Sequence, residues 1–497
     1  MRSFLLGLFL ALLSFVSALS AAGSKLLVVV DDEADKGKYS TFWSDLQCKS
    51  LAATPRYSRN IPINHSSITA RGFQITFRAA KDAQLSLFEH GEPAYSHLLL
   101  LPTKSKGLGP ALQPNLVVDF VNAGSNVLLA LSGASSTPSS ISSLLLELDV
   151  QLPQDRTSLV VDHFNYDSKS ADEKHDVLLL PTAEFARKDI KNYFAVDGLV
   201  ALPRAVGQLL GNASPHLSPV LRASETAYTY NPKEEADGAE EPFATGRQIS
   251  LVTAFQAVNS ARFTILGSSE ALEDAWFDAS VQLAGYKSDS QTSNRAFAQK
   301  LSAWTFKEAG VLKAGPVTHF LNEGAQKNAA NSSTGASLAG VDVNPGIYRI
   351  KNDVYYSIEM SEWVGDHWEP FTPATGDDLQ LEFSMLSPFH RLNLIPSSSS
   401  ANSTLYTQTF KLPDQHGIYN FFVEYRRPFL TNIEEKRTVT VRHFAHDEYP
   451  RSYVITGAYP WISGIWVTIA GWLGFVALWL YSKPSQPKAD IKLEKKL

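Results

Sequence analysis

The feature that most constrains this chain is an uncharged apolar run near its C-terminus, from Trp461 to Tyr481. Crossing the hydrocarbon layer of a bilayer as a helix takes about 20 such residues. Tyr459, Trp461, Trp479 and Tyr481 mark the two ends of the run, where amphipathic rings favour the membrane–water interface. The sequence therefore predicts a transmembrane helix over residues 459–481, with a buried helix of a soluble protein as the alternative.

The tail after this run, residues 482–497, carries five lysines and two acidic residues, a net charge of +3. Positive residues favour the cytosolic side of a membrane. We therefore expect the tail to lie in the cytosol and the bulk of the chain on the other side. The tail ends in charged residues, which argues against a cleaved lipid-anchor signal.

The N-terminus predicts a signal peptide over residues 1–22. Arg2 is followed by an apolar run from Phe4 to Val16 and then by small residues that favour cleavage after Ser20 or Ala22. The alternative is an uncleaved anchor, for which the apolar run is short. Together the two ends predict a single-pass type I membrane protein.

Composition narrows the function classes. The chain has 497 residues, with 44 Lys and Arg against 50 Asp and Glu, which suggests several domains and argues against nucleic acid as the main partner. Its one cysteine, Cys48, excludes an intrachain disulfide and every zinc site built from paired cysteines.

Hydrophobic patterning predicts an α/β domain over residues 23–240, Rossmann-like, with buried strands between helices. A second α/β part or a middle domain is expected over 241–325, and it includes helices at 271–279 and 294–309. The expected strands of the first domain are 25–30, 73–77, 97–101, 127–131, 176–181 and 199–203, and its helices are 112–122 and 139–148.

From residue 326 to 450 the pattern predicts a β-sandwich. Alternating apolar and polar residues recur between turn formers such as Asn344-Pro-Gly346. The expected strands are 348–351, 354–360, 379–383, 407–412, 419–425 and 437–443.

One acidic cluster is a candidate ligand site. Asp31, Asp32 and Glu33 follow the first predicted strand, and open α/β sheets bind ligands at the carboxyl ends of their strands. No Gly-rich phosphate loop follows the cluster, so a solvated strand end remains the plainer interpretation. A free-standing membrane-anchored hydrolase that uses this cluster is the alternative function, and a cell-surface lectin-like receptor is a third.

Two histidine groupings are weaker candidates. His443 and His446 lie near Glu448 at a spacing that could hold a metal, although a polar connector before the span is simpler. The pairs Asp162-His163 and His175-Asp176 lack the G-x-S-x-G elbow of a hydrolase. The residues therefore predict no catalytic, cofactor-binding or metal-binding site.

Modification and packing motifs are clearer. Four sequons offer glycosylation sites at Asn64, Asn212, Asn331 and Asn402. Within the predicted span, Ala470, Gly471 and Gly474 would let another helix approach closely, whereas a lipid-exposed helix is the alternative.

Several stretches resemble one protein family. They are Leu27–Asp32, His97–Pro102, Ala261–Ser268, Trp304–Leu312, Asn352–Tyr356 and Val441–Tyr453. Together they resemble the non-catalytic, single-span subunit of the eukaryotic oligosaccharyltransferase, of the wheat-germ-agglutinin-binding-protein type. The resemblance runs from about residue 24 to the end of the predicted span.

The resemblance implies residence in the endoplasmic reticulum membrane and a part in transferring a preassembled oligosaccharide from dolichyl diphosphate to asparagine. It implies no cofactor and no catalytic residue here, because the family's catalysis belongs to another subunit. The implied partners are that catalytic subunit, ribophorin-like subunits and a small multi-span subunit. The family's dilysine retrieval signal is matched only in part, since Lys495 is third and Lys496 second from the end, with Glu494 fourth.

Overall fold

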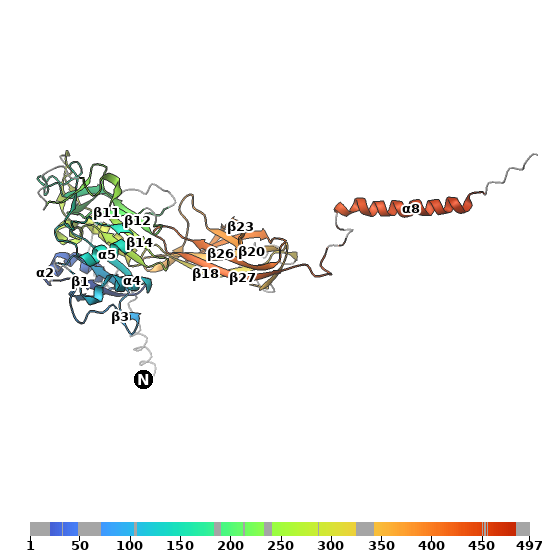
Figure 1. Cartoon of the computed structure of the whole chain (residues 1–497), viewed down its shortest axis with the longest axis horizontal. Helices are drawn as coiled ribbons and strands as arrows, with labels where there is room; N and C mark the ends of the chain where they lie inside the picture. The colour runs from blue at the N-terminus through green and yellow to red at the C-terminus, as the bar shows by residue number, and fades with distance from the viewer. Residues whose placement is uncertain are drawn as a thin grey trace, which may run out of the picture.

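The computed structural model describes residues 20–483 apart from 32, 48–70, 104–106, 183–189, 212–213, 233–240, 287, 325–341, 450, 452–453 and 455. Figure 1 shows three parts in chain order: a rounded α/β body, an elongated β unit and a separate helix, α8. Residues 1–19 of the predicted signal peptide, residues 484–497 of the predicted cytosolic tail and Cys48 lie outside the described residues.

The α/β body is built on a nine-stranded mixed sheet. Five of its strands are parallel neighbours in the order β2-β1-β5-β6-β15. Numbered along the chain, this is 2-1-3-4-5, which is the flavodoxin-like order and not the Rossmann order 3-2-1-4-5-6. The five strands are β1 (Lys25–Val29), β2 (Gln74–Arg78), β5 (His97–Leu100), β6 (Asn126–Ala130) and β15 (Arg262–Leu266).

Helices cover both faces of these parallel strands. Leu26 and Val28 of β1 contribute to one apolar core, whereas Leu27 and Val29 contribute to the other. This alternation follows from the two-residue period of a strand, and it explains why the predicted strands are apolar throughout. The covering helices are α2 (Glu33–Lys36), α3 (Ser40–Gln47), α4 (Pro114–Asn122), α5 (Ser139–Glu147) and α7 (Asn294–Thr305).

An antiparallel extension completes the sheet beyond β15. Strands β14 and β15 follow residue 240 in the chain and yet belong to this sheet. The segments on the two sides of the expected boundary at 240 therefore share one sheet. The predicted helix over 271–279 is replaced by a 3-10 turn at Glu270–Leu272 and the short α6 (Asp274–Phe277). The extension consists of β14 (Ile249–Gln256), β11 (Gln208–Leu210), β12 (Leu217–Arg222) and β7 (Val150–Gln151).

Two strands predicted for the main sheet lie elsewhere. β9 (Val177–Pro181) and β10 (Leu199–Pro203) pair antiparallel with each other in a sheet of two strands. An apolar run reports that a strand is buried but not which strand it pairs with, so the sequence pattern did not exclude this arrangement. The other small pairs are β8 (Leu159–Val161) with β13 (Tyr228–Tyr230), β3 (Phe88–Glu89) with β4 (Glu92–Pro93), and β16 (Ser280–Val281) with β17 (Ser290–Gln291).

The β unit consists of two five-stranded sheets that share one apolar core. Tyr356 from one sheet stacks on Phe421 from the other, with ring centroids 5.4 Å apart. The first sheet contains β18 (Val311–Leu321), β20 (Asp353–Val364), β21 (His367–Pro370), β24 (Ile395–Ser399) and β25 (Thr404–Lys411). The second contains β19 (Ile347–Arg349), β22 (Gln380–Ser384), β23 (Pro388–Asn393), β26 (Gly417–Tyr425) and β27 (Ile433–Arg442).

Strand β18 extends the β unit toward the N-terminus. It pairs with β20 from Val311 to Leu321, before the boundary expected at residue 326. Its sequence contains Gly315 and Pro316, and the register shifts between Ala314 and Val317. These turn-forming residues hide the strand from pattern analysis, because a bulge accommodates them without ending the pairing.

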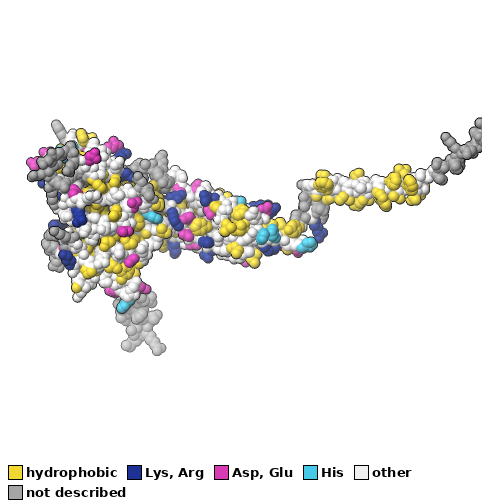
Figure 2. Space-filling model, viewed as in Figure 1, with side chains coloured by type: hydrophobic (Ala, Val, Ile, Leu, Met, Phe, Trp, Pro, Cys, Tyr) yellow, Lys and Arg dark blue, Asp and Glu magenta, His cyan; other side chains and the backbone are white. Residues whose placement is uncertain are grey.

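The apolar C-terminal run forms one continuous helix, α8 (Tyr459–Tyr481). Its mean hydropathy is 1.7, and it is the one helix among the described residues that is long and apolar enough to span a membrane. No part of it is buried against the rest of the chain, and Figure 2 shows hydrophobic side chains along its whole length. Because an isolated helix of this composition would be insoluble in water, its length and surface fit a bilayer.

Candidate functional site

The acidic cluster lies at the carboxyl end of β1, as predicted. Asp31 follows β1 directly and is partly buried. Asp32 and the side chain of Glu33 lie outside the described residues. The neighbouring strand ends add Thr103, which is buried and whose hydroxyl has no hydrogen-bond partner.

An ion pair occupies the next part of the same sheet edge. Arg204 donates two hydrogen bonds to Glu270, from Nη2 at 2.6 Å and from Nε at 3.0 Å. Burial, together with the nearby Glu270, raises the pKa of Glu273, and burial raises the pKa of Tyr39. The Glu270 carboxylate is therefore paired with Arg204 within the fold.

A third carboxylate, that of Asp274, caps the N-terminus of α3, which begins beside this edge. Asp274 accepts hydrogen bonds from the backbone N–H groups of Ser40 and Thr41, each at 2.9 Å, and from the Ser40 hydroxyl at 2.5 Å. The N-terminus of a helix is a natural anion site. Here the chain supplies its own anion, so α3 does not offer that position to a phosphate.

The two predicted Asp–His pairs meet in space, but not as a catalytic triad. His163 and His175 are in direct contact through their Nδ1 atoms, and the Tyr228 hydroxyl lies 3.0 Å from His163 Nε2. The Asp162 carboxylate instead accepts from the Phe164 N–H at 2.9 Å and from other polar groups on its own side. No acid therefore orients either imidazole, as a triad would require.

The segment with His443 and His446 is held by an ion pair. Glu448 accepts from the Arg442 guanidinium at 2.7 and 2.8 Å and from the Ala445 N–H at 2.7 Å. The His443 ring lies against that of His416, with centroids 4.1 Å apart and the ring planes tilted by 37°. Within the residues described, no group of three or more metal-type ligands forms here or elsewhere.

The most completely built polar site is the joint between the α/β body and the β unit. Arg262 at the start of β15 is fully buried and its guanidinium lies 4.6 Å from the Trp304 ring. It donates to the backbone oxygens of Trp304 at 2.5 Å and of Ala309 and Gly310 at 2.7 Å. The Trp304 oxygen belongs to the last turn of α7 and the other two follow the end of the helix, where backbone oxygens lack partners within the helix, so the arginine caps this end.

Aromatic packing carries the joint into the β unit. Trp304 donates its indole N–H to the Phe429 backbone oxygen at 2.8 Å, and the two rings lie 5.7 Å apart at a steep angle. Phe194 contacts both rings. A cavity of about 300 Å³ opens beside this cluster and is lined by residues of both parts, including Gln256 and Asn432.

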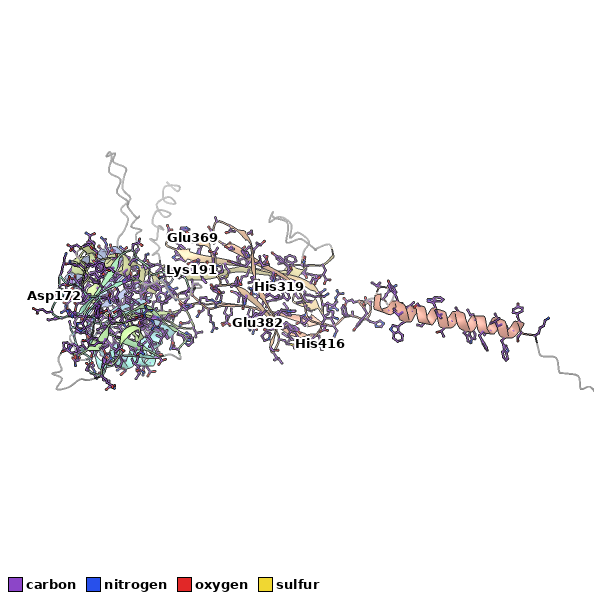
Figure 3. All side chains as sticks on the ribbon, turned by 90° about the horizontal axis from the view of Figure 1, so that it is seen from above. Asp172, Lys191, His319, Glu369, Glu382 and His416 are labelled. Carbon is purple, nitrogen blue, oxygen red and sulfur yellow. The ribbon has the colours of Figure 1, made fainter. Side chains whose placement is uncertain are left out.

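A second polar contact ties the two parts together. Glu362 on β20 accepts from Lys191 Nζ and from the Tyr193 hydroxyl, both at 2.6 Å. Burial and the Glu362 charge raise the pKa of Tyr193, which keeps its hydroxyl protonated as a donor. Figure 3 labels Lys191 where the α/β body meets the β unit.

Arg262 also fixes the protonation of a buried histidine. Its backbone N–H donates to Asn126 Oδ1 at 3.0 Å, so the amide nitrogen of Asn126 faces His97 Nδ1 at 3.2 Å. His97 Nδ1 must then accept, and Nε2 donates to the Gly23 oxygen at 3.0 Å. Burial accordingly lowers the pKa of His97 to about 3.

The stretches Ala261–Ser268 and Trp304–Leu312 both carry the family resemblance, but their sequences do not indicate that they are neighbours in the fold. The structure brings them together on the α/β side of this joint, where Arg262 donates to the Trp304 oxygen. The signal that could have pointed to Arg262 is a single charged residue at the head of an otherwise apolar strand, which is rarely buried without partners.

The remaining predicted residues lie on the surface or outside the described part. Asn402 is exposed in the turn between β24 and β25. Ala470, Gly471 and Gly474 lie on α8 with open space beside the glycines. Asn64, Asn212, Asn331, Lys495 and Lys496 lie outside the described residues.

Comparison with known proteins adds a second line of observation. Residues 64–308 match the family description "OST48, N-terminal domain", and residues 332–483 match "OST48 middle domain". The "Dolichyl-diphosphooligosaccharide–protein glycosyltransferase subunit wbp1" of Schizosaccharomyces pombe is 35% identical over 422 residues, covering 85% of this chain and 89% of that protein. The chain belongs to the OST48 family.

Other OST48-family relatives extend over nearly the whole chain. The "48 kDa subunit" of the same transferase from Arabidopsis thaliana is 30% identical and covers 95% of this chain and 97% of its own length. The zebrafish (Danio rerio) subunit of that name is 31% identical and covers 87% and 91%. A solved ThuA-like structure from Parabacteroides merdae has a TM-score of 0.27 at 10% identity over 57% of this chain and 89% of its own, too weak a likeness to bear on the OST48 fold.

Proposed function

We propose that this chain is the accessory, non-catalytic subunit of the oligosaccharyltransferase complex. That complex transfers a preassembled oligosaccharide from dolichyl diphosphate to the asparagine of Asn-X-Ser/Thr in nascent proteins of the endoplasmic reticulum. The observation that carries the proposal is identity of 30–35% over most of the chain with relatives named as subunits of this transferase. The site geometry agrees, because the charged groups described at the sheet edge stabilise the fold.

The role that fits this chain is assembly and stability of the complex, with substrate guidance as an extension of it. The α/β body would be a doubly wound, Rossmann-like domain of flavodoxin-like strand order, and the β unit would be a β-sandwich. We place the body at residues 23–310, the sandwich at 311–450, and the span at 459–481. The position of β18 in the β unit supports the earlier start of the sandwich.

The proposed orientation is type I, with both folded parts in the lumen and residues 482–497 in the cytosol. The net charge of +3 on the tail supports this direction. The proposed partners are the catalytic subunit, ribophorin-like subunits and a small multi-span subunit. Small residues at Ala470, Gly471 and Gly474 support contact with a neighbouring helix in the membrane.

Two experiments test the proposal. Depletion of the chain should leave many secreted glycoproteins with empty sequons, visible as faster-migrating forms, and re-expression should restore them. Purification of the tagged chain in mild detergent should recover the catalytic subunit and its companions. Full sequon occupancy after complete loss of the chain would exclude the role.

A further inference from the structure

One end of the β unit carries exposed apolar side chains that the fold does not use. Ile347 and Ile418 are each 62% exposed, and Leu386 is 98% exposed. Phe389, on the next strand, is 37% exposed and packs edge-on against Tyr419. We call Ile347, Ile418, Leu386 and Phe389 the exit-end row, because β27 ends beside them and the chain leaves there for α8.

Strand register places two members of the row on one face of the second sheet, and the connection from β22 to β23 brings the other two to the same end. Ile347 of β19 and Ile418 of β26 both pair with Thr440 of β27, so these three side chains share one face. Ser384 of β22 pairs with Asn420. Residues 385–387 form the turn that follows β22, so Leu386 lies at the same end of the sheet as Ile418.

Along β27, exposed residues away from this end are polar or charged. On β27, the residues that share the face of Thr440 further from the exit end are Thr438, Lys436 and Glu434, all exposed. On β22, Glu382 of the same sheet is paired with Arg391 at 3.1 Å. A face that is charged along its length and apolar only at its tip fits contact with an apolar medium at the tip alone.

The short connection to α8 indicates that the apolar medium at the tip is the bilayer. Only residues 443–458 separate β27 from α8, and even fully extended they reach at most about 55 Å. The Arg442–Glu448 pair folds the first of these residues back and shortens that reach. Figure 3 shows His416, the residue before β26, at the end of the β unit that faces α8.

The chemistry of the tip favours lipid over a protein partner. Residues 384–389, Ser-Met-Leu-Ser-Pro-Phe, carry no charge, and His390 and Arg391 follow directly. Arg391 is paired with Glu382 on the other side of the segment, so the tip is apolar between two ion-paired residues. An uncharged apolar tip of this kind can enter the interfacial region of a membrane. A leucine that protrudes from a hairpin offers no pocket of its own, whereas the core of a protein interface packs broad complementary surfaces.

We propose that the exit-end row rests on the bilayer that α8 crosses, with Leu386 as its deepest residue. This contact holds the β unit upright on the membrane and so sets the height of the α/β body above it. The proposal rests on the membrane crossing of α8 proposed above, and it adds a second, peripheral contact with the same bilayer.

The test is photo-crosslinking of the full-length chain in its native complex in microsomes. A photoreactive amino acid replaces Leu386 in one variant and Glu434, which is exposed at the opposite end of the same sheet, in the control. After irradiation, adducts with radiolabelled phospholipid are separated from adducts with protein. We expect a lipid adduct at Leu386 and none at Glu434. A third variant with the photoreactive residue at Ile418 should lose its lipid adduct when Leu386→Asp is added.

Two results would overturn the proposal: adducts at Leu386 formed with protein in place of lipid, or lipid labelling at Leu386 no greater than at Glu434. Alkaline extraction of the same microsomes keeps this failure distinct from failure of the proposed function. If the chain stays in the membrane and Leu386 does not label lipid, only the exit-end contact is wrong. If alkali releases the chain, the span itself is wrong.

Discussion

At the scale of residues, three buried polar groups from distant segments act as one unit. Arg262 bonds Asn126 through its backbone and the end of α7 through its guanidinium, and Asn126 in turn bonds His97. Burial lowers the pKa of Arg262 to about 9, yet the group stays charged at neutral pH. Burying a charge costs free energy unless its donors find acceptors, and three backbone oxygens accept from Nη1 and Nη2, whereas Nε has no hydrogen-bond partner among the described residues.

Replacing this arginine should destabilise the protein more than any surface change. Arg262→Met removes the donors of three backbone oxygens, and we expect a loss of about 3 kcal/mol in the free energy of unfolding. Arg247→Met is the matched control, because Arg247 is 74% exposed and pairs with Glu225 at the surface; it should change stability by about 0.5 kcal/mol or less. Denaturant midpoints of the purified full chain measure both, and equal midpoints would contradict the account.

His97 should make stability fall in acid. Its pKa is about 3 in the folded protein and about 6.5 in the unfolded chain, so between these values the unfolded state binds more protons. The contribution is complete above pH 6.5 and declines as pH falls, by at most about 1.4 kcal/mol per pH unit. His97→Asn should flatten the slope of unfolding free energy against pH between 6.5 and 4.5. Parallel curves for the two proteins would exclude this role.

At the scale of elements, α8 differs from every other helix described. The helices α3, α4, α5 and α7 each bury one side in the α/β body, whereas no residue of α8 is buried. Its small residues have open space around them. Bulky side chains cover most of the remaining surface, so the strip at Ala470, Gly471 and Gly474 is where another backbone can approach.

Filling that strip should weaken assembly in the membrane. Gly471→Leu adds a side chain at the closest approach, and we expect several-fold less catalytic subunit to co-purify in mild detergent. Val476→Leu adds bulk about 140° away around the helix and should leave recovery unchanged. Quantitative immunoblotting of the co-purified subunits gives the comparison; equal loss in both variants would point to a general defect in insertion.

At the scale of the whole molecule, two contacts make the α/β body and the β unit one object. One is the aromatic cluster of Phe194, Trp304 and Phe429, and the other is the Glu362 contact with Lys191 and Tyr193. Because both are largely buried, the joint resists independent movement of the two parts. A rigid joint lets a contact made by the β unit position the body beyond it.

The proposed orientation predicts a glycan on the β unit. Asn402 lies in an exposed turn, so a lumenal β unit offers it to modification. Asn402→Gln should lower the mass of the untreated protein by that of one N-linked glycan, which endoglycosidase H removes from the unsubstituted protein. Ser403→Ala keeps the sequon, because its middle position is free, and should retain the glycan. An unchanged mass in Asn402→Gln would mean that this asparagine carries no sugar.

The sequence by itself determined the elements that depend on local composition. The span is an uncharged run, so α8 covers the predicted residues. Most strands of the β unit alternate in period two, so their positions followed from burial of one face. The family resemblance rested on stretches of residues, and the relatives confirm it.

Only the tertiary structure decided which elements meet. The pattern predicted a Rossmann-like α/β domain without a strand order, and the structure decided that order, the pairing of β9 with β10, and the entry of β18 into the β unit through a bulge. The joint likewise unites Arg262 with Trp304, 42 residues later, and Trp304 with Phe429, 125 residues later. Hydrophobic periodicity reports that a side chain is buried, but its partner is fixed by packing between segments far apart in the chain.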